Sequence, residues 1–157
     1  MSAVMNHPAQ VSEYAVLGFS GVQLALPQRE VVSIDLVTDI DTSAAAGNRL
    51  GTLVKSAQQW SVYTLSDSFD VLHQISDEQR FCVSFGSGRD DDSFALTCEL
   101  VEAVVLDNAG IVQPLPESIL MPAMPMQHCF RNGKGLVLVS DQRGIQDYLL
   151  ALDKVNG

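Results

Sequence analysis

Charged residues are scarce in this 157-residue chain, and basic residues are the scarcest of them. Charged side chains make up 18% of the sequence, with 9 Lys and Arg against 19 Asp and Glu and a formal net charge of −10. A surface of this sign repels polyphosphate and anionic lipid headgroups, so we expect no nucleic acid among the partners and favour a basic protein surface. No apolar run approaches the length of a membrane-spanning helix, which predicts no direct membrane insertion.

The chain also has few of the residues that mark unstructured or repetitive proteins. It contains 11 Gly and 6 Pro, and 46% of its residues are hydrophobic. This composition predicts one folded domain, divided into two small lobes that share a core. Residues 1–13 hold no Lys or Arg and no apolar stretch of a secretion signal. We therefore interpret 1–13 as a flexible leader, 14–153 as the domain and 154–157 as a tail, and expect a cytoplasmic protein.

Motifs for metal binding, cofactor binding and catalysis are missing. The histidines His7, His73 and His128 are far apart, and the acidic run at 90–92 lacks the ligand spacing of a calcium loop. No GxSxG sequence marks a serine nucleophile. We therefore predict no metal, no cofactor and no catalytic residue.

Cysteine leaves one enzymatic alternative open. Cys82, Cys98 and Cys129 are odd in number and form no CxxC pair, which is typical of reduced thiols in a cytosolic protein. Cys129 follows His128, but neighbours in a strand point to opposite faces, so a structural role is favoured for this thiol. A thiol-dependent enzyme using Cys129 or Cys98 remains an alternative, as does a small-molecule-sensing β domain with a pocket between its lobes.

Short apolar segments separated by turn formers predict a mainly β protein. Segments of four to eight residues rich in Val, Leu and aromatic residues are typical of strands, and Gly or Asn between them suits tight reversals. The predicted segments are Tyr14–Phe19, Val22–Leu26, Leu50–Val54, Trp60–Leu65, Phe81–Phe85, Phe94–Leu106, Gly135–Val139 and Tyr148–Leu152. The predicted reversals include Ser20-Gly21, Gly47-Asn48, Ser87-Gly88, Asn108 to Gly110, Asn132-Gly133 and Arg143-Gly144. About ten short strands closed into barrels leave few open edges.

Helical signals are weak. Ser66 or Asp67 is a candidate cap for a short helix that places Phe69, Leu72 and Ile75 on one face. Segments 27–32 and 116–120 each begin with Pro and are predicted to form a turn or two of helix.

Two further features bear on binding. Trp60, the single tryptophan, is favoured as a core residue of its strand, although Trp is also enriched at binding hot spots. Segment 121–126 combines three Met with two Pro. It suits gap filling between the lobes, or alternatively a partner site.

The order of the segments resembles the CheW-like domain, the adaptor family of bacterial chemotaxis. Tyr14–Phe19 and Gly21–Pro27 are similar to the family's first hairpin, and Val31, Val32 and Ile34 follow as its Val-rich segment. Segments 51–57, 62–65, 80–85, 94–104 and 150–153 then resemble its later strands in the same order. The resemblance covers about 14–153 and implies two small five-stranded, SH3-like barrel subdomains with short helices.

The resemblance also implies a function and a contact site. CheW-like domains are non-catalytic adaptors that couple chemoreceptors to a histidine kinase or a related chemosensory protein. The family's Arg-Gly turn, part of its partner surface, is matched here by Ser56-Ala57, and the Asp before Leu by Thr64. Lys55 does not replace the bidentate donor of the missing Arg. These departures favour a divergent member that serves a pilus-based or other chemosensory array. The predicted contacts are Val54, Lys55, Ser56, Ala57 and Trp60.

Overall fold

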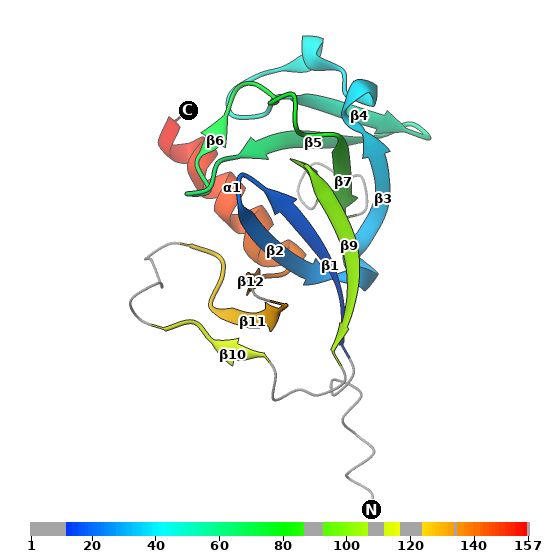
Figure 1. Ribbon diagram of the computed structural model, residues 1–157. Helices are drawn as coiled ribbons and strands as arrows, with labels where there is room; N and C mark the ends of the chain where they lie inside the picture. The colour runs from blue at the N-terminus through cyan, green and yellow to red at the C-terminus, as the bar shows by residue number, and fades with distance from the viewer. Residues whose placement is uncertain (1–11, 87–92, 107–111, 117–123, 134, 157) are drawn as a thin grey trace, which may run out of the picture.

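The computed structural model describes residues 12–86, 93–106, 112–116, 124–133 and 135–156, and most of this part of the chain is β-strand (Figure 1). The longer strands are β1 (Ser12–Phe19), β2 (Val22–Pro27), β3 (Val31–Leu36), β4 (Gly51–Lys55), β5 (Gln58–Leu65), β7 (Phe81–Phe85), β8 (Phe94–Cys98), β9 (Leu100–Leu106), β11 (His128–Asn132) and β12 (Gly135–Val139). Two-residue strands are β6 (Val71–Leu72) and β10 (Gln113–Pro114). Short 3₁₀ turns are η3 (Gln28–Glu30), η4 (Val37–Asp39) and η5 (Thr42–Ala44), and the α-helix is α1 (Gln142–Asn156).

The strands form two sheets, each the basis of one lobe. The first lobe has the strand order β10-β11-β12-β2-β1-β9, and the second has β3-β7-β8-β5-β4 with β6 added to β5. The predicted mainly β architecture of two small subdomains is confirmed. Each sheet has six strands where five were predicted, since β10 and β6 are additional short strands. Within the described residues, the strand pairings do not close either sheet into a full barrel.

Alternation along the strands produces three hydrophobic clusters. Leu17 and Leu24 of the first sheet join Val83 and Leu96 of the second in a shared core between the lobes. The other face of the second sheet forms its own core, which contains Trp60, Val62 and Cys82 among other residues. The other face of the first sheet does the same with Val16, Ala25, Leu106, Phe130 and Val137. The predicted pair of lobes around a common core is therefore present.

The segment 94–106, predicted as one apolar run, crosses between the lobes. It divides into β8 in the second sheet and β9 in the first. The break falls at Glu99, whose backbone N–H donates to the Gly18 carbonyl at 2.7 Å. One continuous apolar segment thus contributes a strand to each sheet. The chain passes directly from one lobe to the other next to their shared core.

The predicted strand at Tyr148–Leu152 is wrong, because these residues lie in α1. Asp141 caps this helix: its Oδ1 accepts a hydrogen bond from the Gly144 backbone N–H at 2.7 Å. Ile145 and Leu149, four residues apart, bury their side chains in the shared core. Arg143-Gly144, predicted as a reversal, is therefore the first turn of the helix.

Of the other local predictions, some are confirmed, one is wrong and some lie outside the described residues. The helix predicted from Ser66 or Asp67 is wrong: the Ser66 hydroxyl accepts from the backbone N–H groups of Ser68 and Asp70, each at 3.1 Å, and Leu72 belongs to β6. The turn predicted after Pro27 is present as η3. The reversals at Ser20-Gly21 and Asn132-Gly133 connect β1 to β2 and β11 to β12. Those at 87–88 and 108–110, the acidic run at 90–92 and most of 116–120 lie outside the described residues.

Thr64, which replaces the family's Asp, belongs to a buried polar ladder. Its hydroxyl oxygen lies 2.7 Å from that of Thr97, and the Thr97 hydroxyl donates to the side-chain oxygen of Gln79. All three side chains are buried. These hydrogen bonds connect β5 and β8 to the segment before β7 and offset the cost of burying the two hydroxyls.

Gly51 provides a test of the packing around β4. A Cβ added at Gly51 would lie 2.5 Å from the backbone oxygen of Asp41. We predict that Gly51→Ala lowers the free energy of unfolding by about 1–3 kcal/mol, since the backbone has to shift. Urea unfolding followed by circular dichroism measures this.

Gly18→Ala is the matched control, because its Cβ would meet only the Leu100 Cβ at 3.6 Å. The control is expected to leave stability unchanged or raise it by up to about 1 kcal/mol. Equal losses in the two variants would contradict the assigned close approach.

Candidate partner-binding surface

The predicted contact loop is the turn between β4 and β5. Ser56 and Ala57 have φ angles of 50° and 66°, and both side chains are exposed. Two successive residues with positive φ make the tight reversal that suits a two-residue hairpin. Val54, at the end of β4, is 59% exposed. The sequence therefore presents an apolar side chain and two strained small residues at one tip.

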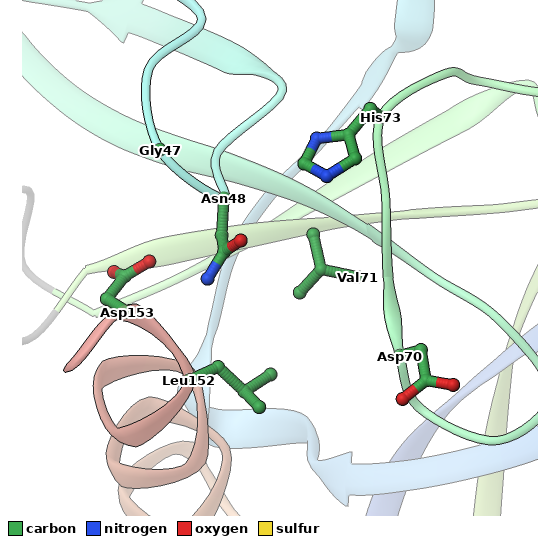
Figure 2. A pocket seen from close by; sticks show the side chains of 7 residues that line it. All are labelled: Gly47, Asn48, Asp70, Val71, His73, Leu152 and Asp153. Atoms are coloured by element: carbon green, nitrogen blue, oxygen red, sulfur yellow. The ribbon is translucent and has the colours of Figure 1, made fainter. Parts of the chain in front are cut away.

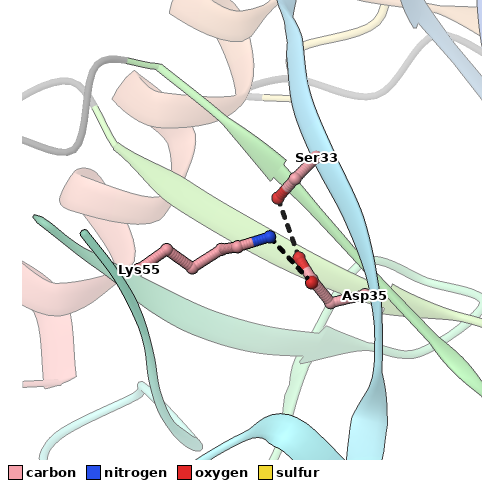
Figure 3. Close-up of polar contacts among 3 residues, drawn as sticks. All are labelled: Ser33, Asp35 and Lys55. Carbon is pink, nitrogen blue, oxygen red and sulfur yellow. Dashed lines mark hydrogen bonds and ion pairs between the residues drawn. The ribbon is translucent and has the colours of Figure 1, made fainter.

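Lys55 connects this hairpin to β3. Its Nζ lies 2.9 Å from Oδ1 of Asp35, and the Ser33 hydroxyl donates to Oδ2 of Asp35 at 2.8 Å (Figure 3). β3 and β4 are the two opposite edges of the second sheet. The ion pair thus spans the open seam where the curved sheet brings its edges together, and the Lys55 ammonium is already engaged.

β3 exposes its apolar side chains and partly buries its polar ones. Val32, Ile34 and Leu36 are 49%, 50% and 52% exposed, whereas Ser33 and Asp35 between them are half-buried. An alternating strand normally turns its apolar residues to the core and its polar residues to water. Here the orientation is reversed.

A β-bulge causes the reversal. Val31 pairs with Phe85, but the next pair is Ser33 with Ser84, so Val32 is an extra residue in the ladder. Beyond the bulge Ile34 pairs with Val83 and Asp35 with Cys82. Because a one-residue shift moves every later side chain to the opposite face, a regular ladder would place Ile34 beside Cys82 in the inner core.

The exposed residues on the two edges share one face of the sheet. Ile34 points to the same side as Val83, which belongs to the shared core, and Asp35 to the same side as Cys82 in the second lobe's own core. Leu53 also faces that inner core, so Val54 next to it faces outward like Ile34. We call Val32, Ile34, Leu36 and Val54 the seam surface.

Trp60, the fifth predicted contact, lies elsewhere. It is 2% exposed and packs with Leu53 and Ile40 in the inner core of the second lobe. The preference for a core role is confirmed, and its side chain is not on the seam surface. Its indole nitrogen is buried and has no hydrogen-bond partner among the described residues.

The cysteines are core residues. Cys82, Cys98 and Cys129 are all free and buried. Burial raises the pKa of Cys82 and of Cys98 to about 12. Cys82 faces the second lobe's own core and Cys98 the shared core, so they point to opposite faces of the sheet. His128 is exposed while Cys129 is buried, which confirms that these neighbours diverge.

Two further sequence predictions can be placed. Met126 is 3% exposed within the shared core and Met124 packs against it, which supports the gap-filling role for this segment, whose residues 121–123 lie outside the described part. Within the described residues no three His, Cys, Asp or Glu side chains form a metal-binding group. In the same part of the chain, no helix has the length and apolar character that crossing a membrane requires.

Sequence reasoning missed most of the seam surface. It placed Val31, Val32 and Ile34 only as a Val-rich segment, and it did not single out Leu36, Ser33 or Asp35. The alternation of residues 32–36 is visible in the sequence but predicts a buried apolar face. The bulge that reverses it depends on pairing with β7, 50 residues away, so no local signal reports it.

The two lobes, their shared core and the exposed sheet edges define a small β scaffold. Comparison of the sequence with protein-family profiles gives no match, and comparison with curated protein sequences gives none either. Solved structures do match the fold. One is the scaffolding protein TtCheW from Thermoanaerobacter tengcongensis, with a TM-score of 0.61, 13% identity and coverage of 82% of this chain and 87% of that chain. The chain therefore has a divergent CheW-like fold, as the order of its hairpins predicted.

The turn at Ala57 stores strain that a substitution should release. Positive φ costs an alanine roughly 1–2 kcal/mol, and glycine adopts it freely. We predict that Ala57→Gly raises the free energy of unfolding by about 1 kcal/mol in urea titrations. Ala103→Gly, at an exposed position of β9, should instead lower it by about 0.5–1 kcal/mol. If Ala57→Gly and Ala103→Gly both lowered the free energy of unfolding, the claim that Ala57 is strained would be contradicted.

The raised thiol pKa values predict slow labelling and alkaline instability. Native protein at neutral pH should react slowly with Ellman's reagent, whereas urea should expose all three thiols. Because folding raises the two pKa values from 9.0 to about 12, their contribution to stability is complete below pH 9 and is lost as pH rises toward 12. Urea midpoints measured across this range should fall, less steeply in Cys82→Ala. Rapid labelling of one native thiol would instead support a thiol enzyme.

Proposed function

We propose that this protein is a non-catalytic adaptor of bacterial chemosensory signalling. In this role it couples chemoreceptors to a histidine kinase or to a related chemosensory protein. The CheW-like fold and the name of a scaffolding protein with the same fold support the class of function. The single observation that supports a particular contact site is the exposed apolar seam surface.

The seam surface has the properties of an uncovered interface. Its four residues are apolar and each is about half exposed or more. Three of them stand on an edge strand, whose outer backbone groups are available to pair with another strand. Since apolar side chains on an open edge invite association, a protein that keeps them exposed gains most when a specific partner covers them.

The partner we propose presents a β edge or an apolar groove with basic residues around it. The chain carries a net charge of −10, and Asp39 and Asp41 are exposed just after β3. The Lys55 ammonium is paired with Asp35, so it does not meet a partner as an unpaired positive charge. Electrostatic attraction should therefore speed association with a basic face and weaken as salt rises.

The missing Arg-Gly turn defines how this adaptor differs from its relatives. Ser56 and Ala57 keep the tight hairpin geometry but supply no guanidinium. Contacts at the tip then depend on Val54 and on backbone groups rather than on bidentate hydrogen bonds. We propose a different chemosensory array, such as one that controls pili, or an altered partner. A cytoplasmic location is part of this proposal.

An enzymatic role has weaker support. A nucleophilic cysteine needs a lowered pKa and access to solvent, whereas Cys82 and Cys98 are buried with pKa values raised to about 12. Cys129 is also buried, and its neighbour His128 points away from it. These observations favour binding over thiol chemistry.

Substitution of the seam surface tests the proposal. The double variant Ile34→Asp, Val54→Asp places charge on both edges at exposed positions. We predict that its affinity for the signalling fragment of a chemoreceptor or for a chemosensory kinase from the same cell falls at least about tenfold. Affinity is measured by biolayer interferometry at two salt concentrations, after circular dichroism confirms folding.

Leu100→Asp is the matched control. Leu100 is 69% exposed on β9 of the other sheet, so the same change of charge falls away from the seam surface. The control should bind like the parent protein. Equal binding by the seam variant and the parent would reject the seam surface as the contact site.

A further inference from the structure

A cavity of about 460 Å³ lies near the C-terminal end of α1, where three segments meet (Figure 2). One wall is the turn with Gly47 and Asn48, the second is the segment around β6, and the third is the last part of α1. The lining residues are Gly47, Asn48, Asp70, Val71, His73, Leu152 and Asp153. This volume lies in the range of small-ligand sites.

Two carboxylates give the cavity negative character, and Arg49, which is close enough to Tyr63 to act against the rise that burial causes in its pKa, offsets part of it. Asp70 and Asp153 line it from different walls. Neither carboxylate forms an ion pair with any residue in the described part of the chain. The carbonyl end of α1 adds partial negative charge beside them. Together with the net charge of −10, this arrangement favours a cation.

Asn48 independently points to a ligand. The residue is 7% exposed, and its side-chain nitrogen Nδ2 is buried without a hydrogen-bond partner among the described residues. Figure 2 shows its amide extending into the space between Asp153 and Val71. A buried donor without an acceptor is costly and uncommon. An acceptor oxygen supplied by a ligand would satisfy it.

The spacing of the acidic groups favours an organic cation over a metal ion. Asp70, His73 and Asp153 line the same cavity, yet they do not converge into a group that could hold a metal. Separated carboxylates suit a cation whose charge is spread over several donors, and a planar guanidinium has this property.

The walls are held in place before any ligand binds. The Tyr148 hydroxyl of α1 donates to the Phe69 carbonyl at 2.6 Å, next to Asp70. The backbone N–H of Asp70 donates to the Ser66 hydroxyl. Tyr63 hydrogen-bonds Asp153 from β5, and burial, the largest cause, raises the pKa of Tyr63 to about 12. Preorganised walls reduce the entropic cost of binding.

We propose that this cavity binds an arginine-type group, a guanidinium with a carboxylate or carbonyl oxygen on the same ligand. Asp70 and Asp153 receive the guanidinium, and Asn48 Nδ2 donates to the oxygen. The group is either free arginine or an arginine residue of a peptide. This site is separate from the seam surface and does not depend on the adaptor role.

Calorimetric titration of the full chain with three probes tests the proposal. L-arginine carries both groups, agmatine lacks the carboxylate, and N-acetyl-arginine amide represents a peptide residue. We expect L-arginine or the peptide analogue to bind, with agmatine several-fold weaker. Stronger binding of the peptide analogue would identify a protein source, and stronger binding of L-arginine a free metabolite. Absence of binding by all three at millimolar concentration would overturn the site.

Three variants assign the contacts. Asp70→Asn should weaken binding at least about tenfold, because it removes a charge-assisted contact. Asn48→Leu should remove the preference for L-arginine over agmatine while leaving the unliganded protein at least as resistant to heat. Asp147→Asn, in an exposed ion pair with Arg143 on the same helix, is the control and should bind normally. Unchanged binding in Asp70→Asn would also overturn the proposal, whatever the outcome of the seam-surface assay.

Discussion

The β-bulge at Val32 is the constraint on which the outer surface of the second lobe depends. One extra residue between the pairs Val31 with Phe85 and Ser33 with Ser84 shifts every later side chain of β3 to the opposite face. Ile34 and Leu36 are turned outward, and Asp35 is turned toward the inner core, where it meets Lys55 at 2.9 Å. The outward orientation of Ile34 and Leu36 and the inward orientation of Asp35 therefore follow from one local irregularity in β3.

Both lobes contribute to the shared core, and the seam surface proposed for binding lies on the second lobe alone. The shared core, with Leu17, Leu24 and Val83 among its members, fixes the lobes against each other and leaves the edges β3 and β4 uncovered. The ion pair across the seam contributes little stability by itself, because Lys55 is 41% exposed and solvent screens it. It marks the place where the β3 and β4 edges approach each other.

Much of the fold was predictable because its signals are local. Ser20-Gly21 and Asn132-Gly133 specify hairpins through residues that accept positive φ, and the short apolar segments between such turns specify strands. The C-terminal helix was missed although Asp141 as cap and the spacing of Ile145, Tyr148 and Leu149 are helical signals. Of the seam surface proposed here, the sequence singled out Val54 beside the Ser56-Ala57 turn, whereas it did not single out the β3 residues as contacts; the contact role itself stays a prediction. Their orientation is set by a ladder with distant β7, and alternation alone predicts the opposite face.

Whether a partner covers the outward-facing residues of β3 and β4 can be observed directly. Methyl NMR spectra of the labelled protein can be recorded with and without the signalling fragment of a chemoreceptor or a chemosensory kinase. We predict that the largest changes occur at the methyl groups of Ile34, Leu36 and Val54. Changes confined to Leu100, Val105 and Leu136 of the other sheet, with the seam resonances unmoved, would contradict it.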